Sequence, residues 1–170
     1  MKRNLRVGIA VSTACLVIFG GGTVANAVAF ATATSPLTLS EDGANLAQAR
    51  GEIVPKTWQT FEYDSAYQRD TRSNGNGVFT KVDTDYFARE YGISGNLLGY
   101  FNNYNVERVR TKATSSAAWT RQTDVTKTVV GTDLTEDLLG QSHVVDVRIC
   151  EDRGVLRADP CKTTSLTFSH

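Results

Sequence analysis

The stretch SHVVDVRIC, residues 142–150, decides the fold class that this sequence predicts. Its residues of one parity are largely apolar: His143, Val145, Val147 and Ile149. Alternation with a period of two is the pattern of a β-strand that buries one face. Such a face needs a second sheet to cover it. The stretch therefore favours a mainly β protein, built as an antiparallel sandwich or barrel-like single domain.

The same stretch ends at Cys150, and Cys161 follows after a segment of ten residues, 151–160. The spacing lacks the C-x-x-C pattern of redox pairs, and two thiols are fewer than the four ligands of a structural zinc site. We therefore predict a structural disulfide between the two cysteines. Residues 163–168 are expected to pair beside the strand at 143–149.

The N-terminal residues have the three parts of a secretory signal peptide. The start is basic, and an uncharged, largely apolar segment, residues 7–19, is followed by three glycines. Two A-x-A cleavage sites follow, at residues 25–27 and 29–31. We favour the first, so that residues 1–27 form the signal peptide and the mature chain is secreted to the extracellular space.

Two other fates of this segment stay open. Residues 7–40 carry no charge and are long enough to span a membrane. However, Gly, Thr, Ser and Asn dominate their second half and no basic stop-transfer cluster follows. Lipidation of Cys15 is the other alternative, but apolar residues continue after it, whereas a lipid-bearing cysteine should follow the apolar region. We expect no stable membrane insertion after cleavage.

The charge balance limits the partners. The chain has 18 basic and 18 acidic residues, and three of the basic ones lie in the predicted signal peptide. The mature part, residues 28–170, therefore has a small excess of acidic residues and the length of one domain. Nucleic acids and anionic membranes are bound by basic surfaces, so neither is expected to be the main partner of this chain. The expected partner is an extracellular protein, peptide or glycan.

Two parts of the mature chain are expected to include short helical turns. Residues 28–56 are interpreted as a flexible or partly helical lead-in to a β-rich domain at 57–170, because Thr38 and Glu41 have the spacing of a capping box. A second turn is expected over residues 83–91. The rest of the domain is expected to form strands joined by polar turns.

Several of those turns can be placed. Two Asn-Gly pairs at residues 74–77 indicate a hairpin turn with a returning strand at 78–82. A further strand is expected at 97–109, and two strands are expected to meet near residues 122–124.

The tyrosines and asparagines in the middle of the chain are the first candidate binding site. The candidates are Tyr86, Tyr91, Tyr100, Asn102, Asn103 and Tyr104. Such side chains stack on sugars or peptides and hydrogen-bond to them. The alternative is core packing with the hydroxyl groups at the edge.

The loop 151–160 is the second candidate. A disulfide-closed, charged loop that presents Leu156 and Arg157 suits an inhibitor or a toxin-like effector, because a rigid loop loses little entropy on binding. The alternative is a closed C-terminal hairpin without a binding role.

Catalytic and metal sites have weaker support. His143 lies next to Ser142 and three residues before Asp146, but both neighbours point away from it in a strand, and no G-x-S-x-G elbow occurs. The carboxylates at Asp133, Glu136 and Asp137 lack the spacing of a known calcium loop. No cofactor or metal ion is expected.

The A-x-A signal, the Thr- and Val-rich body and the terminal pattern VRIC at 147–150 with DPC at 159–161 resemble small secreted disulfide-containing β proteins of Gram-positive bacteria. The resemblance implies export and a disulfide, and it transfers no catalytic residue or ligand. We expect a secreted non-catalytic binding protein. The alternatives are an inhibitor or toxin-like effector acting through the loop, and an extracellular hydrolase that uses His143.

Overall fold

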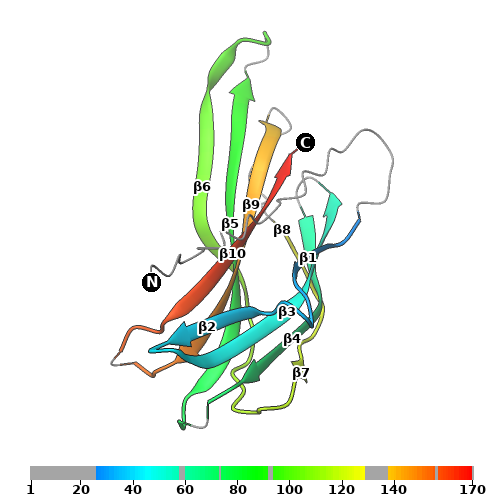
Figure 1. Cartoon of the computed structure of the whole chain (residues 1–170). Coiled ribbons are helices and arrows are strands. Elements are labelled where there is room, and N and C mark those ends of the chain that lie inside the picture. The colour runs from blue at the N-terminus through cyan, green and yellow to red at the C-terminus, as the bar shows by residue number, and fades with distance from the viewer. Residues whose placement is uncertain are drawn as a thin grey trace, which may run out of the picture.

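The described part of the chain is a sandwich of two antiparallel β-sheets (Figure 1). The computed structural model describes residues 26–57, 60–72, 74–91, 94–128, 138–155 and 157–169. Every regular element in these ranges is a strand, so none of them is a helix that could cross a membrane. The predicted antiparallel β fold is confirmed.

The first sheet is centred on two long strands, β3 (Ala44–Thr57) and β4 (Thr60–Asp70). Two strands flank β3 on its other edge: β1 (Val28–Ala31) and β2 (Leu37–Glu41). Two short strands pair with β4: β7 (Thr120–Arg121) and β8 (Val125–Thr128). The two strands expected on either side of residues 122–124 are present, and both pair with β4, not with each other.

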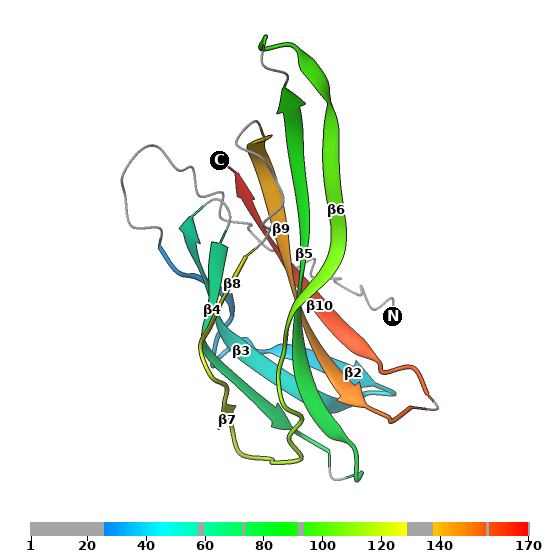
Figure 2. The ribbon, with the colours of Figure 1, turned by 180° about the vertical axis from the view of Figure 1, so that it is seen from behind.

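The second sheet has four strands in the order β10–β9–β5–β6. Their bounds are Cys161–Ser169 for β10, Leu138–Asp152 for β9, Gly77–Tyr91 for β5 and Leu97–Arg110 for β6. In both ribbon views the β5–β6 hairpin extends beyond the strands of the first sheet (Figure 2). One end of the second sheet therefore has no first-sheet strand opposite it.

The core lies between the sheets, and the stretch at 142–150 supplies one side of it. The side chains of His143, Val145, Val147 and Ile149 are buried in β9, as the alternation predicts. Residues of the first sheet face them, including Leu46, Ile53, Phe61 and Tyr63. Burial raises the pKa of the Tyr63 hydroxyl well above its usual range, so this phenol stays neutral.

A buried polar network joins the two sheets. Gln68 of β4 is fully buried, and its amide nitrogen donates to the backbone oxygens of Val78, at 3.0 Å, and Lys112, at 2.8 Å. Its oxygen accepts from the hydroxyls of Thr80, at 3.1 Å, and Thr111, at 2.7 Å. The amide thus donates two hydrogen bonds and accepts two, so its burial leaves no polar group of this side chain without a partner.

The expected lead-in at 28–56 is wrong, because this segment forms β1, β2 and most of β3. Asp42 and Gly43 have φ angles of 50° and 78°. Two successive residues with positive φ are typical of a tight hairpin turn. The Asp-Gly dipeptide therefore closes the β2–β3 hairpin, and Glu41 ends a strand instead of belonging to a capping box.

Two other local predictions are also wrong. Residues 83–91 are strand and not a helical turn, because β5 pairs with β6 on one side and β9 on the other, which uses its backbone groups. The turn at 74–77 joins β4 to β5, which lie in different sheets and do not pair as a hairpin. The strand predictions at 78–82 and 97–109 are confirmed.

The disulfide is present between Cys150 and Cys161, with 4.2 Å between the Cα atoms. The two residues are directly opposite each other in the β9–β10 pair, and residues 163–168 pair along 143–148 as expected. The disulfide therefore closes the loop at the end of a hairpin.

Candidate functional site

The outer face of the first sheet carries a row of stacked cationic and aromatic side chains. Arg50 of β3 is directly opposite Tyr67 of β4, and Gln48 is opposite Arg69 one step along the strands. Strand residues of one parity share a face, and here the opposite parity is buried in the core: Ala47, Ala49, Ile53 and Gln68. The side chains of the first set are therefore held on the side of the sheet away from the second sheet: Gln48, Arg50, Tyr67 and Arg69.

Trp119, which directly precedes β7, completes the row. The Arg50 guanidinium carbon lies 4.6 Å from the Tyr67 ring centre and 4.9 Å from that of Trp119. The Arg69 guanidinium carbon lies 4.5 Å from the Trp119 ring centre. The order is thus Tyr67–Arg50–Trp119–Arg69, which we call the arginine–aromatic stack. Each such cation–π contact stabilises by roughly 0.5–1 kcal/mol.

Hydrogen bonds hold one end of the arginine–aromatic stack. Arg69 donates from Nε and from a terminal nitrogen to Gln48 Oε1, at 2.9 and 2.6 Å, and Gln48 donates to the Thr38 hydroxyl at 3.1 Å. The Nε atom of Arg50 is buried and has no hydrogen-bond partner within the described ranges. Among the ion pairs of those residues, neither arginine has a carboxylate partner.

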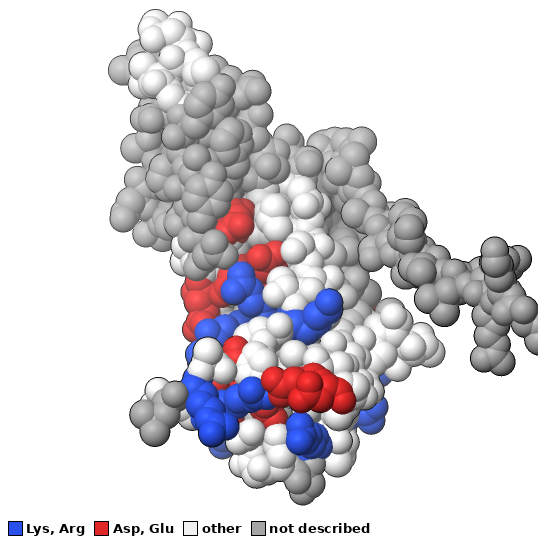
Figure 3. Space-filling model, turned by 60° about the vertical axis from the view of Figure 1, so that its left-hand side comes forward, with Lys and Arg blue, Asp and Glu red and all other residues white. Residues whose placement is uncertain are grey.

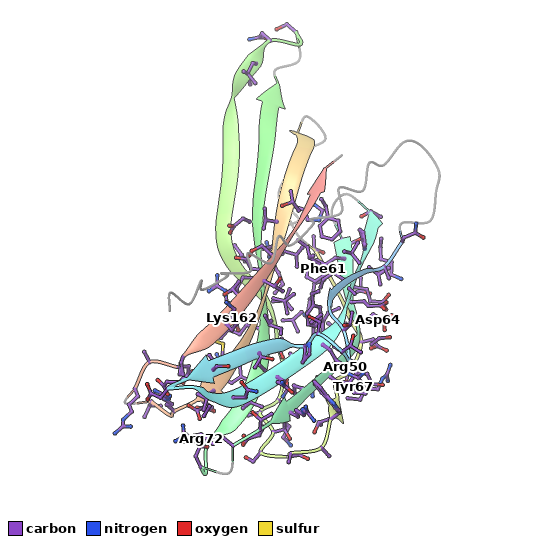
Figure 4. All side chains as sticks on the ribbon, viewed as in Figure 1. Arg50, Phe61, Asp64, Tyr67, Arg72 and Lys162 are labelled. Carbon is purple, nitrogen blue, oxygen red and sulfur yellow. A yellow bond between two sulfur atoms is a disulfide. The ribbon has the colours of Figure 1, made fainter. Side chains whose placement is uncertain are left out.

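A pocket of about 370 Å³ lies beside the Tyr67 end of the stack. Its wall is formed by β1 and the residues after it, by β3 and by β4: Ala29, Ala31, Thr32, Ala33, Arg50, Gly51, Glu52, Ser65 and Tyr67. Figure 4 shows Arg50 and Tyr67 together on the first sheet, with Asp64 near them. The lining combines small apolar side chains with hydroxyl groups, one cationic side chain, Arg50, and one anionic side chain, Glu52.

Two unusual backbone positions shape this pocket. Gly51 has a φ of 151°, and an added Cβ would lie 2.8 Å from the Ala66 Cα and 2.9 Å from the Phe30 ring. Only glycine fits there. Ser65 has a φ of 48°, and its N–H donates to Asp64 at 2.6 Å and to Asp124 at 3.1 Å.

The acidic group next to the pocket already has partners. Desolvation opposes ionisation of Asp124, but the Ser65 N–H and the Arg121 guanidinium outweigh it and lower the pKa of this carboxyl. Arg121 lies 2.7 Å from Asp124 in an ion pair. Asp124 is thus paired with Arg121 and not with Arg50 or Arg69.

The predicted tyrosine and asparagine site falls on the projecting β5–β6 hairpin. The backbone register places Tyr86 opposite Asn103, Asn102 opposite Phe87, Tyr100 opposite Arg89 and Tyr91 opposite Leu97, with Tyr104 farther along β6. The side chains of these candidates lie outside the described part of the structure. The hairpin therefore gathers the six residues on two paired strands, and their binding role stays a prediction.

An ion pair between Arg153 and Glu41 ties the disulfide loop to the first sheet. Arg153 contacts Glu151 at 2.7 Å and also pairs with Glu41 at the end of β2. Basic and acidic side chains intermingle on the face that carries this loop (Figure 3). Arg157 is exposed, and Leu156 lies outside the described residues. A polar pocket of about 370 Å³ lies between the loop and the β2–β3 turn.

Among the residues considered for catalysis, the described side chains of His143 and Asp146 are not brought together in an accessible site. His143 is only 1 % exposed, and its ring stacks on Phe168 with 5.0 Å between the ring centres. Asp146 lies on the other side of the strand, where it accepts from Ser165 at 2.6 Å. The Ser142 side chain and the carboxylates at 133–137 lie outside the described residues.

No protein-family model, no curated protein and no solved structure matches this chain. The candidate site is therefore defined by the geometry of the chain itself. The arginine–aromatic stack was missed in the sequence because its members come from β3, β4 and the segment before β7. No local pattern marks them.

Proposed function

We propose that this chain is a secreted, non-catalytic binding protein, and that its binding face is the outer face of β3, β4 and β7. The observation that carries the proposal is the arginine–aromatic stack beside a pocket. Tyr, Trp and Arg are the residue types most enriched in binding hot spots. Stacking also holds them in place before a ligand arrives, which lowers the entropy cost of binding.

The start of the fold supports export with cleavage after Ala27. β1 begins at Val28, and Phe30 within it is only 7 % exposed in the core. Cleavage after Ala31 would remove this strand, whereas cleavage after Ala27 leaves it whole. The intact mass of protein recovered from culture medium should match a chain that starts at Val28 and contains one disulfide. A cell-bound chain that starts at Met1 would contradict export.

The binding face is tested with purified mature protein on an array of extracellular polysaccharides and peptides. Trp119→Ala should weaken any binding seen for the wild-type protein by about tenfold or more, because it removes the centre of the stack. Lys127→Ala is the matched control, since Lys127 is an exposed residue of β8 in the same sheet. Equal loss in both variants, or no loss in either, would place binding elsewhere.

An inhibitor that acts through the disulfide loop is the second candidate function. Val155 is fully exposed at the loop, and Arg153 donates its N–H to Asp159 at 2.9 Å across it. A braced loop with an exposed tip suits insertion into a partner's cleft. Inhibition of a panel of extracellular proteases, abolished by Arg157→Ala, would favour this function over the first.

A further inference from the structure

The chemistry that the arginine–aromatic stack presents to a ligand differs from that of a bare aromatic platform. The guanidinium groups of Arg50 and Arg69 both lie over the Trp119 ring. A sugar or base that stacks on an aromatic residue needs an open ring face. Both guanidinium groups compete with a ligand for the Trp119 ring, and their N–H edges are the groups that they add to this surface.

These edges suit oxyanions. A guanidinium donates two parallel hydrogen bonds to a carboxylate or phosphate, and stacking on aromatic rings leaves those donors available. Within the described residues, Arg69 uses two of its donors on the neutral Gln48, and neither arginine has a carboxylate partner. Two cations that stack on one ring and have no ion-pair partner among the described residues form a two-point receptor for negative groups.

The surroundings favour widely spaced, singly charged groups over a dense polyanion. Glu52 lines the pocket next to Arg50 and repels added negative charge. The predicted mature chain also has more acidic than basic residues. The hydroxyl-bearing residues of the same pocket, Thr32, Ser65 and Tyr67, are suited to hydrogen-bond with sugar hydroxyls.

We propose that the outer face of the first sheet binds an acidic glycan, with sugar carboxylates on Arg50 and Arg69 and a neighbouring sugar in the pocket. This inference rests on the proposed binding function and names its ligand class. A single carboxylate for each arginine balances the local charge without placing a second anion against Glu52.

The experiment measures binding of oligogalacturonate to the mature protein by calorimetry, with neutral dextran and inorganic polyphosphate as comparison ligands. The double variant Arg50→Gln/Arg69→Gln should bind at least about tenfold more weakly, because each lost contact is a charge-assisted hydrogen bond. Glu52→Gln should bind about two- to threefold more tightly, because it removes a repelling charge. Arg110→Gln is the control, since Arg110 is an exposed arginine at the end of β6, in the second sheet.

Glu52→Gln is expected to raise the affinity for oligogalacturonate, whereas poor folding would lower it. This variant therefore tests the proposal even if the double variant folds poorly. No binding of oligogalacturonate, equal loss with Arg110→Gln, unchanged affinity in the double variant, or tighter binding of polyphosphate would each overturn the acidic-glycan proposal. Dextran binding that depends on Trp119 would also overturn it, but would leave the proposed binding face standing. Ligand binding that is unaffected by Trp119→Ala would refute the proposed binding face itself.

Discussion

Replacing Phe30 by alanine tests whether β1 belongs to the core. The Phe30 ring is 7 % exposed, stacks on Tyr63 with 5.9 Å between the ring centres, and covers Gly51, where an added Cβ would lie 2.9 Å from it. Truncation of a buried phenylalanine costs about 3–5 kcal/mol. We expect about 3 kcal/mol, because β1 pairs with β3 alone and can relax around the cavity.

The assay is urea unfolding followed by circular dichroism. With a slope of roughly 1.5–2 kcal/mol per molar urea for a domain of this size, the midpoint should fall by roughly 1.5–2 M. Phe30→Leu is the control and should cost less, because it keeps most of the apolar volume. A loss below about 1 kcal/mol for Phe30→Ala would refute the reasoning, since such small values are typical of surface positions.

Three further predictions concern stability. Replacing Cys150 and Cys161 with serine should lower the free energy of unfolding by about 3 kcal/mol, seen as a matching urea shift of the wild-type protein in dithiothreitol; no shift would contradict a structural role. Gln68→Leu should cost about 2–4 kcal/mol in thermal unfolding, because it leaves buried partners unpaired; a neutral effect would show that the network is dispensable. Burial alone would raise the pKa of Glu151, but hydrogen bonds from Arg153, Asn74 and Asn76 outweigh it and lower this pKa in the folded protein. The ionised Glu151 should therefore stabilise the fold at pH values above its ordinary pKa, and this stabilisation should be lost as the pH falls through the lowered folded pKa. Glu151→Gln should flatten that acid limb, and an unchanged pH profile would contradict the assignment.

The strand at 143–149 could be predicted because its alternating pattern is local. The disulfide could be predicted because few cysteines are available to pair. Alternation along β9 directly reports which side chains the second sheet buries. The two cysteines outside the predicted signal peptide allow one pairing, and the structure has that disulfide. A sandwich followed from the need to cover an apolar strand face.

The errors came from reading local patterns without the cross-strand context. The spacing of Thr38 and Glu41 fits a helix cap, but the Asp42-Gly43 turn folds β2 onto β3 and satisfies the backbone there. Likewise, residues 83–91 become strand because partners on both sides supply hydrogen bonds. Tertiary pairing outweighs weak local preference in both cases.

The arginine–aromatic stack could not be predicted from sequence spacing. Arg50 and Arg69 lie on adjacent strands, and Trp119 reaches them only because β7 pairs with β4 next to Tyr67. The bulge at Ser65 shifts the register between β3 and β4. That register sets which residues share the outer face, and it has no counterpart in the linear pattern.

Hydrogen–deuterium exchange with and without oligogalacturonate tests the location of the binding face most directly. The account predicts slowed exchange on β3 near Arg50, on β4 near Tyr67 and in the segment around Trp119, with no change in the disulfide loop. Slowed exchange confined to the β5–β6 hairpin or to residues 151–160 would contradict the account and assign binding to one of the other two surfaces.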